Sequence, residues 1–453
     1  MQKNIIRLMI LSVLIILCIW QTITLWLGDM SGHNFFASSI SSDESSYIHP
    51  KQIWNNINGS IYKIISHSEK EDLLNELVTE LRKDNIHIEL GPKETYEQLL
   101  YESQGMVYEF GTPLTIDEII GEYLEPKNSK YESVNIKQIY VDVSLAHTYK
   151  VYVYLIDQEA KVKQKITLKV PLKYAADMIA LYKEQENVKY HKLYQPSITS
   201  TSDREFFVGN VFYPQMNARQ PLKGKLFKFT KIEEADVENY IRDLFKNPSF
   251  ITNNTTTSST VYSDNLNISV KYNNTGTLEF KKTLLNDTGK LTDVERINKI
   301  NAFIEDSRAI PNSLKKGLYL EEVYLDEETG EMRYRFGYRH EDSEIVILSE
   351  TVKRSLNIES FLELGIKNSE VISGKWLMYQ IEHTNEDAQI TMESKDAIEA
   401  VYENSGLLEL EAFKLDDLEC AYILNNTSRP VAFEWLGVYM GQPIFTVEKI
   451  DNE

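Results

Sequence analysis

The longest apolar run in the chain predicts a membrane-spanning helix near the N-terminus. Residues 8–27 read LMILSVLIILCIWQTITLWL, which is 20 residues without a formal charge. A helix rises about 1.5 Å per residue, so this run spans the roughly 30 Å hydrocarbon core of a bilayer. We therefore predict a cytoplasmic segment at residues 1–7, a transmembrane anchor at 8–27 and a polar, Ser-rich tether at 28–49.

The charges beside this run predict its orientation. Lys3 and Arg7 precede it without an acidic neighbour, and Asp29 follows it. The positive-inside rule then predicts a single-pass protein of the cell membrane, with the N-terminus cytoplasmic and the bulk of the chain extracytoplasmic. Trp20 and Trp26 fit the outer half of the bilayer and its outer interface, where aromatic rings anchor a helix.

A cleaved signal peptide is the alternative interpretation of the run. Its apolar region normally has about 7–15 residues and ends in an Ala-x-Ala-like site. The run here is longer, and Trp26-Leu27-Gly28-Asp29 offers no such site. Leu17 also precedes Cys18, where a lipoprotein needs a small residue. The pattern therefore favours an uncleaved anchor.

One face of the predicted anchor carries the candidate contact with another helix. Helical spacing places Leu14, Cys18, Gln21 and Leu25 on this face. A buried Gln21 would hydrogen-bond a neighbouring helix, as polar residues do between transmembrane helices. In the alternative interpretation Gln21 lies close enough to the outer end to reach interfacial water. The sequence leaves both interpretations open.

Beyond residue 49 the apolar pattern changes between helical and strand periodicity. Residues 50–58 read as a short helix or turn. Apolar positions at helical spacing predict helices at residues 68–81, 171–183, 233–245, 291–305 and 394–402. Alternation predicts strands at residues 60–66, 105–110, 134–144, 149–157, 163–170, 260–272, 277–282, 318–325, 332–340, 407–415, 419–424, 431–439 and 443–447.

The order of these elements predicts an α+β fold with antiparallel sheets packed against helices. Polar, turn-rich stretches near residues 196–221 indicate a boundary. We predict three extracytoplasmic domains at residues 50–215, 216–345 and 346–453. The order of a helix followed by antiparallel strands occurs in each of the last two, so we expect them to be similar in topology.

Composition excludes several classes of partner. The 453 residues carry a formal net charge of −20. Nucleic-acid binding needs basic clusters, and anionic lipid would repel an acidic surface, so we expect neither to be bound through the outer part. Without Lys3 and Arg7, the remaining chain carries −22, because 46 basic side chains stand against 68 acidic ones. The two cysteines lie far apart, and an extracellular chain without disulfides is typical of a Gram-positive bacterium.

No motif for catalysis, a cofactor or a metal emerges from the sequence. Nucleophile-elbow, phosphate-loop, dinucleotide and zinc-helix patterns are absent. The best metal candidate, Glu382, His383, Glu386 and Asp387, surrounds Thr384-Asn385, which reads as a solvated loop. The acidic stretch at 321–331 lacks the calcium-loop order, and residues 326–330 read as a hairpin turn. We therefore predict a non-enzyme without a cofactor.

Several segments together resemble a known family. The anchor is followed by Met106-Val-Tyr-Glu-Phe-Gly-Thr-Pro-Leu, then by Val237-Glu-Asn-Tyr-Ile-Arg-Asp-Leu-Phe-Lys-Asn-Pro-Ser-Phe and by Val261-Tyr-Ser-Asp-Asn-Leu-Asn-Ile-Ser-Val. This order resembles the YycH family, membrane-anchored regulators of the WalK (YycG) sensor histidine kinase. The resemblance implies three outer domains, the last two alike, and a complex with the kinase and a YycI-like companion. It implies no catalytic residue.

Two functional hypotheses follow. In the first, the chain modulates a sensor histidine kinase of a cell-wall two-component system through contacts of its transmembrane helix and its outer part. In the second, it is an extracytoplasmic ligand-binding or wall-associated module that the helix only tethers. The second hypothesis requires a concave aromatic pocket in the outer part, and it predicts that the released outer part retains its function.

Overall fold

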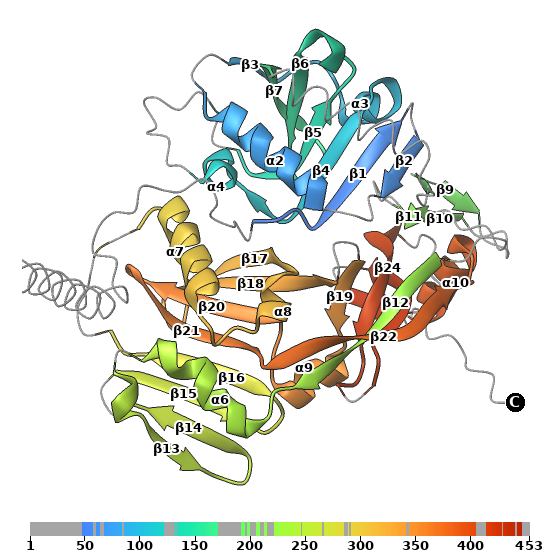
Figure 1. Cartoon of the computed structure of the whole chain (residues 1–453). Helices are drawn as coiled ribbons and strands as arrows, with labels where there is room; N and C mark the ends of the chain where they lie inside the picture. The colour runs from blue at the N-terminus through green and yellow to red at the C-terminus, as the bar shows by residue number, and fades with distance from the viewer. Residues whose placement is uncertain are drawn as a thin grey trace, which may run out of the picture. The chain divides into compact units, whose positions relative to one another are not determined.

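The computed structural model describes most of the chain beyond the predicted tether (Figure 1). The described residues are 48–57, 60–63, 68–83, 86–121, 131, 134–170, 192–194, 197–199, 205–208, 213–214, 222–245, 247–264, 267–284, 289, 291–340, 344–404, 414–427, 429–439 and 442–445. All of them belong to one unit, Tyr47–Glu453. Several predicted segments lie outside this set, among them the helix at 171–183 and most of the strand at 407–415.

The first sheet is antiparallel and has nine described strands. Its order is β11-β8-β2-β1-β4-β5-β6-β7-β3. The strands are β1 (Gln52–Ile57), β2 (Ser60–Lys63), β3 (His87–Leu90), β4 (Gly105–Leu114), β5 (Ile136–Asp142), β6 (Lys150–Ile156), β7 (Val162–Lys169), β8 (Lys192–Tyr194) and β11 (Tyr213–Pro214). The sequence-based strands in this part are confirmed. The prediction of a helix or turn at residues 50–58 is wrong, because Gln52–Ile57 pairs with both β2 and β4.

Short helices cover both faces of this sheet. The predicted helix α2 (Ser68–Leu81) is confirmed, and its buried residues Leu73, Leu74, Leu77 and Leu81 repeat at helical spacing. In Figure 1 it crosses one face of the sheet. Helices α3 (Tyr96–Glu102) and α4 (Ile116–Ile120) each begin with a capping box, in which a Thr hydroxyl and the side chain of the third helical residue satisfy backbone N–H groups. The 3-10 turn η1 (Ala146–Thr148) connects β5 to β6.

Twelve described strands form a second, larger sheet. Its order is β13-β14-β15-β16-β21-β20-β18-β19-β24-β25-β26, and β17 pairs with β18 off this path. The strands are β13 (Thr252–Thr255), β14 (Ser259–Ser263), β15 (Ile268–Asn273), β16 (Thr277–Lys282), β17 (Leu318–Asp326), β18 (Glu331–His340), β19 (Glu344–Leu348), β20 (Leu362–Lys367), β21 (Glu370–Leu377), β24 (Asp417–Leu424), β25 (Ala432–Tyr439) and β26 (Gln442–Phe445). All neighbours are antiparallel except β19 and β24, which are parallel.

The predicted division into domains stays a prediction. The boundary between residues 345 and 346 falls within β19, and the second sheet takes strands from both sides of it. A helix followed by an antiparallel hairpin occurs twice, as α7 (Asp293–Asp306) before β17–β18 and as α10 (Ser394–Asn404) before β24–β25. The α+β class with mainly antiparallel sheets is confirmed.

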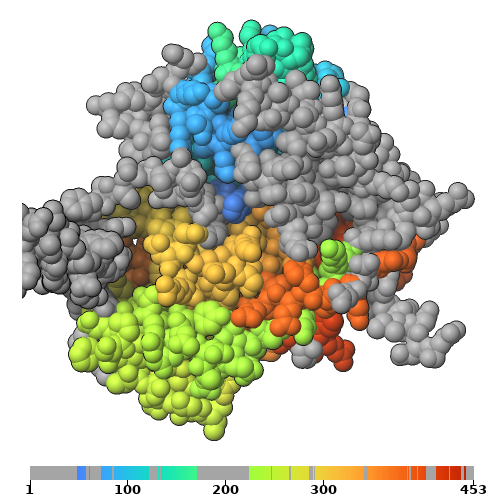
Figure 2. All heavy atoms as spheres, viewed as in Figure 1, coloured from blue at the N-terminus to red at the C-terminus, as the bar shows by residue number. Residues whose placement is uncertain are grey.

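Helices cover the second sheet through apolar faces, and an indole bond fixes the segment that follows α7. Helix α7 buries Val294, Ile297, Ile300 and Ile304, and the buried Trp376 donates its indole N–H to the carbonyl of Ala309 at 2.8 Å. The remaining helices are α6 (Glu234–Ile241), α8 (Asn312–Lys315) and α9 (Glu350–Leu356), with 3-10 turns η2 (Arg242–Leu244) and η3 (Pro248–Phe250). The residues around α6 and β13–β16, yellow-green in Figure 2, form a closed, convex surface on the face shown.

Two smaller strand groups complete the described structure. The strands β12 (Leu222–Lys231) and β22 (Tyr379–Ile390) form a long antiparallel pair with a bulge between Lys225 and Phe227. The strands β9 (Ser197–Thr199), β10 (Glu205–Val208) and β23 (Lys414–Leu415) form a short sheet. The β12–β22 pair was not predicted from the sequence.

The two large sheets approach each other most closely where β4 lies against β17. A Cβ atom added to Gly111 on β4 would lie 2.4 Å from the carbonyl oxygen of Leu320 on β17 and 2.9 Å from the Cα of Glu321. A Cβ atom does not make non-bonded contacts this short, so the backbones approach at a spacing that only glycine permits.

We expect Gly111→Ala to destabilise the protein by about 1–3 kcal/mol, because the new methyl group must push β4 away from β17. Urea unfolding of the full chain in detergent measures the effect. The neighbouring, partly buried Thr112 supplies the control, and Thr112→Val should change the free energy of unfolding by about 0.5 kcal/mol or less. Equal effects of both substitutions would contradict the close approach.

Candidate functional site

The predicted membrane-contact residues lie outside the described part of the chain. These residues are Lys3, Arg7, Leu14, Cys18, Trp20, Gln21, Trp26 and Leu25. Among the residues that the structure does describe, no helix is long and apolar enough to cross a membrane. The anchor, its orientation and its contact face therefore stay predictions.

The best metal candidate of the sequence lies on a strand. Glu382, His383, Glu386 and Asp387 belong to β22, and the prediction of a solvated loop at this point is wrong. Neighbouring residues of a strand point to opposite faces, so Glu382 and His383 diverge. Glu382 instead pairs with Lys228 of β12 at 2.9 Å. No group of three or more His, Cys, Asp or Glu within the described ranges is arranged to hold a metal ion.

The acidic stretch around residue 326 forms the predicted hairpin turn. The carboxylate of Asp326 accepts the backbone N–H groups of Glu328 at 3.0 Å and Thr329 at 3.2 Å. Gly330 closes the turn with a φ of 68°, a conformation that suits glycine. Arg333 then pairs with Glu331 at 2.8 Å and with Glu363 at 3.1 Å. These carboxylates stabilise the sheet and are not arranged around an ion.

His340 is a histidine of the core. It is 3% exposed at the end of β18, with its ring stacked on Phe227 of β12 at 3.6 Å between centroids. His383 approaches from β22 at 5.1 Å and Tyr422 from β24 at 5.9 Å. Burial, and to a smaller extent the neighbouring His383, lowers the pKa of His340 to about 4.

A cluster of charged side chains lies where β1 and β4 meet β17 and β24. The Lys51 ammonium lies 3.5 Å from a carboxylate oxygen of Glu419, and the side-chain amide of Gln52 donates to the other oxygen. Glu419 is only 4% exposed. We call this cluster the junction cluster; its members are Lys51, Gln52, Glu109, Lys137, Tyr319, Asp417 and Glu419.

Burial and the repulsion of neighbouring carboxylates raise the pKa of two acids of the junction cluster, Glu109 and Asp417. Lys137 lies 4.0 Å from Glu109 and donates to the carbonyl of Gly111 at 2.8 Å. Burial outweighs the two nearby lysines and raises the pKa of Glu109. Burial, followed by the charge of Glu419, raises the pKa of Asp417 to about 7. For Lys51, the attraction of Glu419 and Asp417 exceeds the opposing effect of burial and raises its pKa well above the ordinary value.

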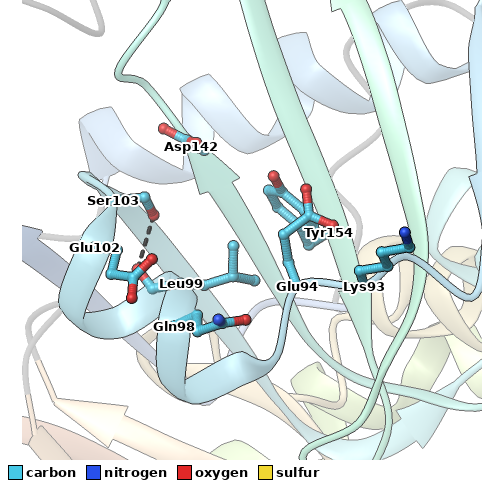
Figure 3. A pocket seen from close by; sticks show the side chains of 8 residues that line it. All are labelled: Lys93, Glu94, Gln98, Leu99, Glu102, Ser103, Asp142 and Tyr154. Atoms are coloured by element: carbon cyan, nitrogen blue, oxygen red, sulfur yellow. Dashed lines mark hydrogen bonds between the residues drawn. The ribbon is translucent and has the colours of Figure 1, made fainter.

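A pocket of about 360 Å³ opens beside α3 (Figure 3). In the view, Leu99 points from α3 into the pocket, and Tyr154 of β6 and Glu94 lie on the opposite side. Asp142 lies at the end of β5 and is 8% exposed. The lining residues are Lys93, Glu94, Gln98, Leu99, Glu102, Ser103, Asp142 and Tyr154. The volume is at the lower end of the range for ligand sites.

Hydrogen bonds and one ion pair hold the pocket walls. Ser103 donates to the carbonyl of Leu99 at 2.7 Å, and its hydroxyl also bonds the Tyr140 hydroxyl at 2.7 Å. Glu94 pairs with Lys165, whose ammonium lies 5.5 Å from the centre of the Tyr154 ring. The bond from Lys165 lowers the pKa of Glu94, and burial raises that of Tyr154 to about 12. The walls are therefore preformed.

Comparison with known proteins gives a structural match and no match of sequence. No family model matches the chain, and no curated protein matches it. The crystal structure of YycH from Bacillus subtilis matches it with a TM-score of 0.58 and 15% sequence identity. The match covers 89% of this chain and 96% of that chain. The chain has the YycH fold. The resemblance first drawn from short sequence segments is thereby confirmed at the level of the fold.

Neither the junction cluster nor the pocket beside α3 was predicted from the sequence, although weak signals for both exist. Glu109 interrupts an otherwise apolar strand, and Asp417 and Glu419 alternate with buried apolar residues along β24. Thr95 and Gln98 have the spacing of the capping box that begins α3 beside the pocket. None of these signals shows which distant strand lies opposite.

We expect His340→Phe to remove an acid-induced loss of stability. Because the pKa of His340 is lowered in the folded state, its stabilising effect is complete above pH 6.5 and is lost as the pH falls toward 4. Between pH 8 and pH 5 this amounts to about 2 kcal/mol. Denaturant unfolding at both pH values tests it, with each variant compared with the wild type at the same pH, because the raised pKa of Asp417 changes the stability of all of them in the opposite direction. His147 is exposed, and His147→Phe should retain the loss; if His340→Phe retains it as well, the expectation is wrong.

Proposed function

We propose that the chain is a membrane-anchored, extracytoplasmic regulator of a sensor histidine kinase in a cell-wall two-component system. The observation that carries the proposal is the extent of the match to YycH, 89% of this chain and 96% of the other. A match over nearly the whole of both chains goes beyond one shared motif. The apolar run at residues 8–27, preceded by Lys3 and Arg7, supports the membrane anchor.

The proposed partners are a WalK-like kinase and a YycI-like companion, with the bilayer contacted through residues 8–27. In this proposal Leu14, Cys18, Gln21 and Leu25 contact the transmembrane helices of the kinase complex. A bound helix shifts the kinase between signalling states only if its affinity for the two states differs. The role is therefore one of binding, and it requires no catalytic residue, cofactor or metal.

We expect replacement of residues 8–27 by an unrelated spanning helix to abolish regulation of the kinase. Lys3 and Arg7 are kept in this variant so that the orientation does not change. The control carries the same foreign helix with Leu14, Cys18, Gln21 and Leu25 restored at their positions, and it should recover at least half of the regulation. Kinase output is read from a reporter of the two-component system at equal protein levels. Unchanged output in the fully replaced variant would exclude the helix contact.

A tethered ligand-binding module is the second candidate function. The pocket beside α3 favours it, because its walls are held by internal bonds and a buried carboxylate, Asp142, lines it. Under this function the helix needs only to span the membrane. The outer part would then keep its activity on any anchor of the correct orientation.

Two glutamates on α3 separate the candidates. Glu102 lines the pocket, whereas Glu97 does not, and both are exposed. We expect Glu102→Lys and Glu97→Lys to change stability by about 0.5 kcal/mol or less, and to leave kinase output unchanged, because the pocket has no role in the proposed regulation. Loss of output with Glu102→Lys alone, measured by the same reporter, would favour the ligand-binding module.

A further inference from the structure

The junction cluster combines two properties that lead to coupling with pH. Its carboxylates come from different strands, Glu109 from β4 and both Asp417 and Glu419 from β24. Lys51 lies 3.5 Å from Glu419 and Lys137 lies 4.0 Å from Glu109, whereas Asp417 forms no ion pair within the described residues, although its spacing from Glu419 places both on one face of β24. Glu419 is almost completely buried, and β4 lies against β17 beside it. Two cations do not neutralise three anions in such a place, so one carboxylate gains from holding a proton.

The other groups around Asp417 do not remove the excess of negative over positive charge in the cluster. Tyr319 of β17 is 2% exposed and contributes a neutral hydroxyl to the cluster. Glu321 of the same strand is exposed and adds negative charge at the edge of the cluster. The positive charge of Arg339 on β18 acts to lower the pKa of Tyr319, against the larger effect of burial. Asp417 receives a backbone N–H from Leu418 at 2.9 Å, a bond that does not balance its charge.

We propose that Asp417 binds a proton as the pH falls from mildly alkaline to mildly acidic values, and that this proton strengthens the contact between the first sheet and the second. The outer part is then more tightly closed in acid. The sign follows from linkage, because a folded state that binds a proton more strongly than the opened state becomes more stable as the pH falls. The inference concerns contacts within the chain only and does not rest on the proposed function.

The physical step is the loss of repulsion between Asp417 and its neighbours. Without the proton, the charge of Asp417 repels the neighbouring carboxylates, and this repulsion opposes the contact of β4 with β17. A proton on Asp417 leaves two carboxylates, which Lys51 and Lys137 balance. The change is confined to one place in the fold, so its effect should appear in the strands of the junction and not in remote strands.

Hydrogen exchange of the full chain in detergent micelles tests the proposal. Protection factors of β4, β17 and β24 are measured at about pH 8 and pH 5.5, with β14–β16 as the internal reference. We expect protection of the junction strands to rise on the order of tenfold in acid, corrected for intrinsic exchange. The reference strands should not share this rise. His340 has the opposite sign, so each variant is compared with the wild type at the same pH.

Asp417→Asn is the decisive variant, because it places a neutral side chain of the same shape in the cluster. It should show high protection at both pH values. Asp416 is exposed on the preceding position, and Asp416→Asn should keep the response of the wild type. Glu109→Gln is the second variant and stays informative if Asp417→Asn does not fold. It should reduce the rise in protection between pH 8 and pH 5.5, because it leaves two carboxylates beside the two lysines. A wild-type response in Asp417→Asn, an undiminished response in Glu109→Gln, or no response in the wild type would overturn the proposal.

Discussion

The parallel pairing of β19 with β24 is the interaction on which the second sheet depends. Val346, Ile347 and Leu348 lie opposite Tyr422, Ile423 and Leu424, and all but the half-buried Ile347 are buried. In the order of the described strands, β19 alone connects β18 with β24. Without this short ladder, β24, β25 and β26 would form a separate three-stranded sheet. The ladder also places Asp417 and Glu419 near Tyr319, and therefore creates the charged junction with the first sheet.

Local pattern predicted the elements whose stability is mainly local. Helix α7 has a capping box at Thr292 and four buried apolar residues at helical spacing, and both signals lie within its own sequence. Strand β1 was missed because Asn55 and Asn56 read as turn residues, yet both are fully buried. The cost of burying the Asn56 amide is offset because its side-chain nitrogen donates to the carbonyl of Leu99 at 3.1 Å and to that of Ser103 at 3.0 Å. The partners that make such a strand possible are distant in sequence, so its own residues do not reveal it.

The sites were less predictable than the fold for a related reason. The sequence contains 68 acidic residues, and most acids in a protein lie in water, so no single one stands out. Glu419 is buried where Lys51 and Gln52, at the start of β1, bond its carboxylate. That burial depends on how two sheets meet, a contact that neither periodicity nor spacing encodes. The pocket beside α3 depends in the same way on the approach of a helix to β5 and β6.

The predicted tether limits how the outer part and the anchor act together. A Ser-rich linker, which the sequence predicts for residues 28–49, would transmit position and force poorly. A change in the outer part would therefore reach a kinase through direct contact of the outer part with the kinase or its companion. The anchor would contribute by keeping the chain in the membrane and by its own helix contacts. Once the helix is bound, the tether would raise the effective concentration of the outer part near the kinase. Under this arrangement the two contacts add their free energies, and a weak outer contact is sufficient to bias the state of the kinase.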